Sequence, residues 1–95
     1  MKKQTPESIL LHQVRDYLRL KGFYVIRNQA GLGTHPGLCD IIAISPKGGT
    51  FYIELKSPKG KLSPKQEVFK SELLSRDAAY CVVKTWKEFI EAFLW

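Results

Sequence analysis

Residues 37–56 read GLCDIIAISPKGGTFYIELK, and the prediction of the fold starts from them. They contain two short apolar runs, 38–44 and 50–55, on either side of the turn-forming sequence Pro-Lys-Gly-Gly at 46–49. Apolar runs of this length, rich in Ile, Phe and Tyr and separated by a Pro/Gly cluster, predict a β-hairpin.

Three charged residues interrupt these apolar runs: Asp40, Glu54 and Lys56. Side chains alternate between the two faces of a strand, so Glu54 and Lys56 share a face, and the hairpin brings Asp40 beside Glu54. Burying a carboxylate in a sheet costs several kcal/mol unless it is paired or binds a metal. The two acids and the lysine therefore require an explanation.

Two explanations fit this spacing. In the first, Glu54 and Lys56 form a salt bridge and Asp40 caps a strand end. In the second, the acids bind a divalent cation, because Mg²⁺ prefers oxygen ligands and needs only one or two carboxylates plus a phosphate. A lysine on the same face could then orient a water molecule or stabilise developing phosphate charge.

The order Asp40, then Glu54-Leu55-Lys56 across a hairpin, resembles the Asp … Glu-x-Lys core of the PD-(D/E)XK nuclease superfamily. Further features resemble its VRR-NUC branch: an acid early in the first helix, a Gly-x-x-Asp sequence at 37–40, and a glutamine that opens a later helix. The resemblance covers residues 7 to about 83. One position departs from the family pattern, because Cys39 stands where proline often precedes the aspartate.

The resemblance implies a Mg²⁺-dependent nuclease, with Mn²⁺ as a substitute, on a restriction-endonuclease-like α/β fold. It implies that the metal is held by Asp40, Glu54, the Leu55 carbonyl and Glu7, while Lys56 aligns the attacking water. Small stand-alone members of this family, often viral, are linked to branched DNA. The implied substrate is therefore branched DNA such as a four-way (Holliday) junction.

The sequence before the hairpin predicts a helix and a strand. Thr5-Pro6-Glu7 is typical of a helix start, and apolar residues follow at helical spacing up to Gly22. Glu7 lies four residues before Leu11, on the core-facing side, where it could reach the sheet end that holds Asp40. The plainer reading is an acid that stabilises the helix dipole. Residues 23–27 then predict a strand that ends at Arg27.

Two segments are candidates for contacts with DNA phosphates. The Gly-rich loop 29–36 is either a plain connection or a flap that meets DNA, with His35 as a loop residue or phosphate contact. The segment after the hairpin places Lys59 and Lys61 near Lys56, as a solvated turn or as a clamp for the phosphate backbone. Arg27 is expected to bind backbone as well.

Gln66 has two competing explanations. Ser63 and Gln66 form a Ser-x-x-Gln capping box at a helix start, which accounts for the glutamine structurally. The family resemblance instead puts Gln66 at the active site, where it would hold Lys56 or a phosphate. One side chain is not expected to serve both roles fully, and the active site is favoured slightly.

The last part of the chain predicts a strand and a helix. Residues 80–84 (YCVVK) form a continuous apolar strand, expected to be central in the sheet and parallel to its partner, because a helix precedes it. Residues 86–94 carry apolar side chains at the spacing of an amphipathic helix. The expected order is α-β-β-β-α-β-α around a mixed sheet, in one domain spanning 1–95.

Composition supports a nucleic-acid partner. The 95-residue chain carries a net charge of +6, which suits a polyanion, and 44% hydrophobic residues allow a small core. No apolar run could span a membrane and no secretory signal is visible. Cys39 and Cys81 are expected as buried free thiols in a reducing cytoplasm. The resemblance to small viral family members implies that this is the cytoplasm of a bacterial or phage-infected cell. Surplus apolar surface suggests a homodimer.

The alternatives to a junction-cutting nuclease are a non-catalytic nucleic-acid-binding module on the same fold and a nuclease that cuts flaps, ends or plain duplex. Nothing in the sequence resembles a base-reading helix or a zinc module. Selection by DNA shape is therefore expected in place of selection by sequence.

Overall fold

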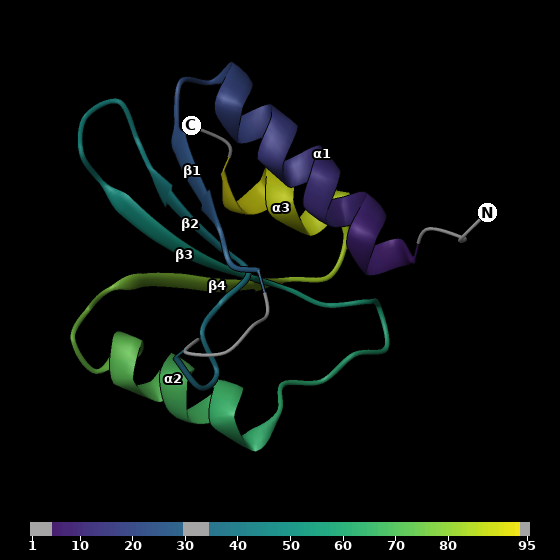
Figure 1. Cartoon of the computed structure of the whole chain (residues 1–95), viewed down its shortest axis with the longest axis vertical. Coiled ribbons are helices and arrows are strands. Elements are labelled where there is room, and N and C mark those ends of the chain that lie inside the picture. The colour runs from purple at the N-terminus through teal and green to yellow at the C-terminus, as the bar shows by residue number, and fades with distance from the viewer. Residues whose placement is uncertain (1–4, 30–34, 94–95) are drawn as a thin grey trace.

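The structure is a computed structural model, and it describes residues 5–29 and 35–93. Its helices and strands follow the predicted order α-β-β-β-α-β-α (Figure 1). Their bounds are α1 Pro6–Leu20, β1 Tyr24–Arg27, β2 Ile41–Ile44, β3 Thr50–Leu55, α2 Pro64–Leu74, β4 Ala79–Val83 and α3 Trp86–Ala92.

The four strands form one mixed sheet in the order β1-β2-β3-β4. β1 and β2 are antiparallel, β2 and β3 form the predicted antiparallel hairpin, and β4 pairs parallel to β3. The hairpin turn closes with Ser45 N donating to the Gly49 carbonyl at 2.8 Å. Gly48 takes a positive φ of 92° in this turn, a conformation that glycine adopts at little cost.

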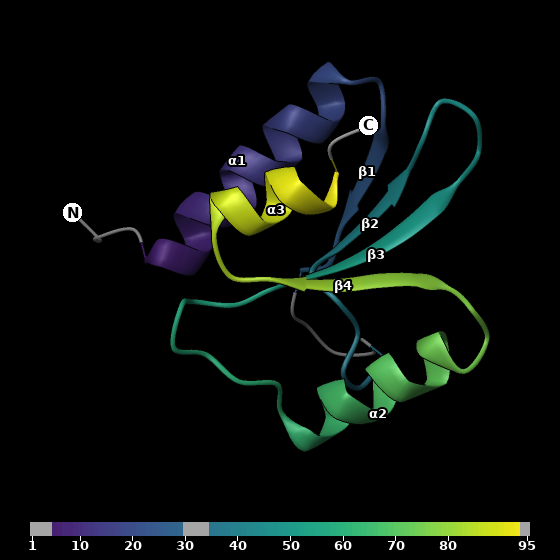
Figure 2. The same ribbon diagram turned by 180° about the vertical axis from the view of Figure 1, so that it is seen from behind.

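The prediction that residues 80–84 form a central strand is wrong, because β4 lies at the edge of the sheet. Its apolar run has a different cause. Helices cover both of its faces: α1 and α3 lie on one side of the sheet and α2 lies on the other (Figures 1 and 2). A strand covered on both faces is apolar throughout even when one of its edges is free.

The hydrophobic core lies between the sheet and the α1–α3 layer. The residues that build it include Leu10, Val14, Leu18, Ile41, Ala43, Ile53, Leu55, Val83, Phe89 and Phe93. α1 supplies Leu10, Val14 and Leu18 at the predicted helical spacing, and Ile53 and Leu55 come from one face of β3. Glu54 therefore faces the opposite layer, where α2 lies. Leu94, the last residue of the predicted helix 86–94, lies outside the described residues.

α2 packs less tightly than the other helices. It has no buried residue, and Val68 and Leu74 are 62% and 48% exposed. Its aromatic contact with the sheet comes from Phe69, whose ring lies near Tyr52 of β3 and Tyr80 of β4 at centroid distances of 6.4 and 6.2 Å. The position of α2 therefore depends strongly on contacts at its N-terminus, described below.

The two cysteines are free thiols, as predicted; Cys39 is buried and Cys81 is half-buried. In the parts of the chain that the structure describes, no helix is both long and apolar enough to cross a membrane.

Candidate functional site

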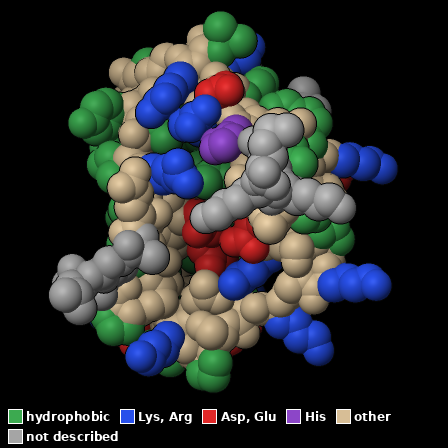
Figure 3. All heavy atoms as spheres, turned by 45° about the vertical axis from the view of Figure 1, so that its right-hand side comes forward, with side chains coloured by type: hydrophobic (Ala, Val, Ile, Leu, Met, Phe, Trp, Pro, Cys, Tyr) green, Lys and Arg blue, Asp and Glu red, His purple; other side chains and the backbone are tan. Residues whose placement is uncertain are grey.

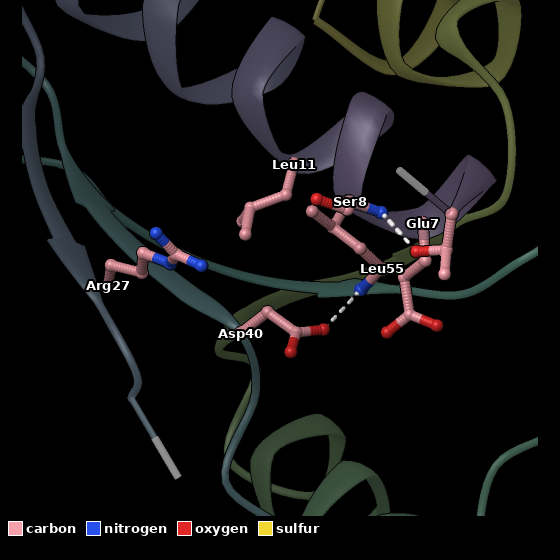
Figure 4. A pocket seen from close by; sticks show the side chains of 7 residues that line it. Glu7, Ser8, Leu11, Arg27, Asp40 and Leu55 are labelled. Atoms are coloured by element: carbon pink, nitrogen blue, oxygen red, sulfur yellow. Dashed lines mark hydrogen bonds between the residues drawn. The ribbon is translucent and has the colours of Figure 1, made fainter. Parts of the chain in front are cut away.

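The candidate site begins where β2 meets β3. β2 starts at Ile41, which is the register partner of Ile53, so Asp40 and Glu54 face each other across the end of the ladder. The Leu55 N–H donates to Asp40 Oδ2 at 2.8 Å (Figure 4). The Asp40 side chain thus accepts the bond that a backbone carbonyl would accept within a continuing ladder. The predicted proximity of Asp40 to Glu54 is thus confirmed, and the Asp40 side chain is fixed against β3.

Glu54 is an ionisable side chain that is buried, with 2% exposure. Its Oε1 accepts from Gln66 Nε2 at 2.5 Å, and Lys56 Nζ lies 3.9 Å from the same oxygen. Its Oε2 is also buried and has no hydrogen-bond partner within the described residues. A buried carboxylate oxygen without a partner is costly, so this atom marks a position that suits a cation or a proton.

This environment changes the acidity of Glu54. Burial, followed by the nearby Asp40 carboxylate, raises the pKa of Glu54 from 4.5 to about 8, and Lys56 opposes that shift. Burial, and then Glu54, also raise the pKa of the Cys39 thiol to about 12. A divalent cation bound at Glu54 would offset the repulsion from the Asp40 carboxylate and favour the ionised form of Glu54.

Gln66 completes the capping box and also reaches Glu54, so the expectation that one side chain could not make both kinds of contact fully is wrong. Its Oε1 accepts from the Ser63 N–H at 2.8 Å, which completes the capping box with Ser63 Oγ, while its Nε2 donates to Glu54. The reason is that the amide has an acceptor at one atom and donors at the other. The predicted contact with Lys56 or a phosphate is replaced here by the contact with Glu54.

Gly37 holds the segment before Asp40 against the start of α2. It has a positive φ of 76°, and a Cβ placed there would lie 2.2 Å from the Lys65 carbonyl oxygen and 3.0 Å from the Gln66 nitrogen. Only glycine permits this approach without a shift of the backbone. The sequence pattern singled out Gly37, but not this packing reason, which requires the three-dimensional position of α2.

A hollow of about 350 Å³ opens beside Asp40. Its lining residues come from α1, β1, β3 and the segment before β2: Thr5, Glu7, Ser8, Leu11, Arg27, Asp40 and Leu55. Figure 4 shows the Glu7 and Asp40 carboxylates directed into this hollow, with Arg27 on the other side of Asp40. The structure thus places Glu7, Asp40 and Leu55 together, and adds Arg27 to them.

The three predicted acids do not form one compact group. Glu7 approaches Asp40 from the α1 side of the sheet, whereas Glu54 faces α2 and meets Asp40 at the end of the ladder. Over residues 5–29 and 35–93, no three His, Cys, Asp or Glu side chains are close enough together to hold a metal ion. The potential ligands are therefore the pair Asp40 and Glu54, with Glu7 at the rim of the hollow.

The Leu55 carbonyl is a further potential ligand. In an extended strand the N–H and C=O of one residue point to the same side. The Leu55 N–H points to Asp40, so its carbonyl also faces this side, beyond the last residue of β2.

The other predicted DNA contacts are spread around this centre. Lys61 lines a second hollow, formed with Lys56 and α2. Lys59 is exposed in the turn that the Gly60 N–H closes by donating to the Ser57 carbonyl. His35 instead packs on α2, with its ring 5.8 Å from that of Phe69, and does not line the hollow beside Asp40.

The surface around the acids is basic. In Figure 3 acidic side chains occupy a recess near the middle of the face, and Lys and Arg side chains surround it. Two of the lysines at the second hollow, Lys70 and Lys84, were not singled out from sequence. They lie far from Lys56 along the chain, in α2 and just after β4, so no local motif identifies them.

No protein-family model matches the chain, and no curated protein matches it in sequence. A solved structure described as a VRR_NUC domain is similar to it, with a TM-score of 0.81 and 22% sequence identity. The similarity covers 97% of this chain and 100% of that chain. The chain therefore has the fold of a VRR-NUC domain, as the sequence resemblance implied.

Proposed function

We propose that this chain is a divalent-metal-dependent, structure-selective DNA endonuclease that hydrolyses phosphodiester bonds in branched DNA such as four-way junctions. One observation carries the proposal. At the end of the β2–β3 ladder, the buried Glu54 carboxylate has an oxygen with no partner among the described residues, and Glu54 lies beside Asp40 and Lys56. A solely structural Glu54–Lys56 pair would leave that oxygen unexplained.

The residues present fit Mg²⁺, with Mn²⁺ as a substitute. Asp40 and Glu54 supply carboxylate oxygens, Leu55 supplies its carbonyl, and Glu7 acts directly or through water. Mg²⁺ is commonly held by one or two carboxylates and completed by substrate phosphate and water, so a compact group of three acids is not required. When bound, such an ion polarises the scissile phosphate and stabilises the leaving oxygen.

The remaining side chains have roles that follow from their positions. Lys56, with Nζ 3.9 Å from Glu54 Oε1, is placed to orient the attacking water and to stabilise negative charge on the phosphate. Gln66 is a positioning residue, because its amide holds Glu54 Oε1 and leaves Oε2 available. Ionisation of Glu54 on metal binding is favoured because the ion offsets the repulsion from Asp40.

DNA as the substrate is supported by the net charge of +6 and by the basic side chains around the acidic recess (Figure 3). Arg27, Lys59 and Lys61 contact backbone phosphates in this proposal, and His35 contributes from the loop before β2. We also propose a homodimer that makes paired cuts across a junction, supported by the exposed Leu20 and Tyr24, 83% and 69% exposed. The free thiols fit a reducing cytoplasm.

A second candidate is a non-catalytic DNA-binding module on the same fold. The observation that favours it is the absence of a three-acid group within the described residues. A nuclease that acts on flaps, ends or plain duplex is a third candidate with the same site.

The experiment that tests the proposal is a panel of four-way junctions, flaps, ends and duplex, incubated at fixed salt with Mg²⁺, Mn²⁺ or Ca²⁺. We expect junction cleavage with Mg²⁺ and Mn²⁺, and binding without cleavage with Ca²⁺. Asp40→Asn and Lys56→Ala should abolish cleavage and retain most binding, whereas the exposed Asp16→Asn should cleave normally. Binding without cleavage of any substrate would favour the binding module, and preferential cleavage of another substrate would overturn the junction assignment.

A further inference from the structure

A second hollow, of about 440 Å³, lies on the α2 side of Lys56. It is bounded by the segment after β3, by α2 and by the end of β4. The lining residues are Lys56, Gly60, Lys61, Leu62, Glu67, Lys70, Val82 and Lys84. Val82 is the register partner of Glu54, so this hollow begins directly beside the candidate site on the same face of the sheet.

The charge of this hollow is strongly positive, because four lysines line it against the single carboxylate of Glu67. Lys56 is the one lysine of the four with an ion pair in the described part of the chain, to Glu54. Lys61, Lys70 and Lys84 come from three separate segments and converge without a carboxylate partner there. Like charges gathered on one concave surface repel each other, and an anion in the hollow would remove that repulsion.

The shape and lining of the hollow indicate which anion fits. Leu62 and Val82 add apolar surface, and the half-buried Gly60 closes one side without a side chain. A Cβ at Gly60 would lie 3.1 Å from Ser57 Oγ and 3.3 Å from Lys56 Cβ. Lysines around an apolar surface suit a phosphate attached to a sugar, since the ammonium groups bind the phosphate oxygens and the apolar side chains contact deoxyribose carbons.

We propose that this hollow binds a backbone phosphate of a DNA strand next to the phosphate at Lys56, with Lys70 and Lys84 as its main contacts. The inference rests on the proposed function in taking DNA as the substrate. It adds two contacts, and it gives the DNA strand a path over the protein surface, from Asp40 past Lys56 toward α2. Glu67 opposes binding at this position.

The affinity of the protein for DNA in Ca²⁺, in which no cleavage is expected, tests the assignment independently of cleavage. Affinity for a four-way junction in Ca²⁺ is measured by fluorescence anisotropy across a salt series, for the unmodified protein and for Lys70→Ala/Lys84→Ala. The slope of log K against log[salt] is negative, and removal of one phosphate contact should reduce its magnitude by about 0.9. The matched control is Lys47→Ala/Lys87→Ala, which removes the same charge from the hairpin turn and α3 and should leave the slope nearly unchanged.

A methylphosphonate scan then locates the phosphate. Each phosphate near the cut position is replaced in turn by an uncharged methylphosphonate, and one replacement should weaken binding by the unmodified protein on the order of 10-fold. The same replacement should have little further effect on Lys70→Ala/Lys84→Ala. Glu67→Gln should strengthen binding, because it removes the one opposing carboxylate.

Several outcomes would overturn the assignment: an unchanged salt slope in the lysine variant, additive effects of the variant and every methylphosphonate, or a slope change that the control pair reproduces. Titration with inorganic phosphate distinguishes a site for a DNA backbone phosphate from a site for free phosphate. One outcome is that inorganic phosphate changes the NMR chemical shifts of Lys70 and Lys84 while the salt slope of DNA binding is the same in the lysine variant. That outcome would assign the hollow to a free phosphate ligand and contradict the DNA contact. A protein that binds DNA in this manner but never cleaves it would refute the nuclease proposal and leave this phosphate contact supported.

Discussion

Gln66 Nε2 donates to Glu54 Oε1 at 2.5 Å, and this bond joins the start of α2 to the buried acid of β3. The same amide accepts from the Ser63 N–H at 2.8 Å, so the helix cap and the candidate site share one side chain. Because α2 has no buried residue, this contact and the packing of Gly37 carry much of its placement. The orientation of the Glu54 carboxylate is thereby tied to the N-terminus of a helix.

The two functions of Gln66 can be separated by substitution. Gln66→Ala removes the bond to Glu54 and the half of the capping box that Gln66 Oε1 supplies. Ser63→Ala removes the other half, in which Ser63 Oγ accepts from the Gln66 N–H, and leaves the Gln66–Glu54 bond in place. We expect each variant to lose about 1 kcal/mol of unfolding free energy in urea, a typical effect of losing an N-cap. Single-turnover cleavage should fall on the order of 10-fold or more in Gln66→Ala and change little in Ser63→Ala. Equal loss of cleavage in both would show that Gln66 acts through the helix cap alone.

The pH dependence of stability should report the raised pKa of Glu54. Between the unfolded value of 4.5 and about 8, the folded protein holds a proton on Glu54 that the unfolded chain has released. Stability of the metal-free protein should therefore fall as pH rises from about 5 to about 8, and this contribution should be constant below and above that range. Thermal unfolding in a chelating buffer measures it.

Glu54→Gln should flatten this fall, whereas Glu91→Gln, an exposed acid of α3 that pairs with Lys87, should retain it. Saturating Mn²⁺ should oppose the fall, because an ion that binds the ionised pair stabilises the folded state. A decline that persists unchanged in Glu54→Gln would place the responsible group elsewhere.

Gly37 and Gly48 form a matched pair for measuring the close approach to α2. Both have positive φ, 76° and 92°, but a Cβ at Gly48 would have no atom within 4 Å, while one at Gly37 would meet the Lys65 backbone. Gly48→Ala should cost about 1–2 kcal/mol of unfolding free energy, the usual penalty of left-handed backbone for alanine. Gly37→Ala should cost more, because the backbone must also shift, and it should reduce cleavage by moving Asp40 relative to Gln66. Equal costs for the two variants would argue against the contact with α2.

Sequence reasoning recovered the order of the elements, the hairpin and the neighbourhood of Asp40 and Glu54, because strand alternation and a Pro/Gly turn are local signals. β4 was wrongly predicted to be a central strand. An apolar run indicates that both faces of a strand are covered, here by helices, but it does not indicate how many strands lie beside it. Sequence reasoning treated the two roles of Gln66 as competing, because the direction of each half of an amide depends on the fold. The clustering of Lys61, Lys70 and Lys84 could not be predicted from sequence either, because three segments that are distant along the chain meet there.

Mn²⁺ binding by the metal-free protein, measured by electron paramagnetic resonance, tests whether Asp40 and Glu54 together hold a divalent ion. We predict saturable binding that Asp40→Asn and Glu54→Gln each weaken on the order of 10- to 100-fold, with Glu91→Gln binding as the unmodified protein does. Mn²⁺ binding that is unchanged in Asp40→Asn and Glu54→Gln would show that these two carboxylates do not hold the ion.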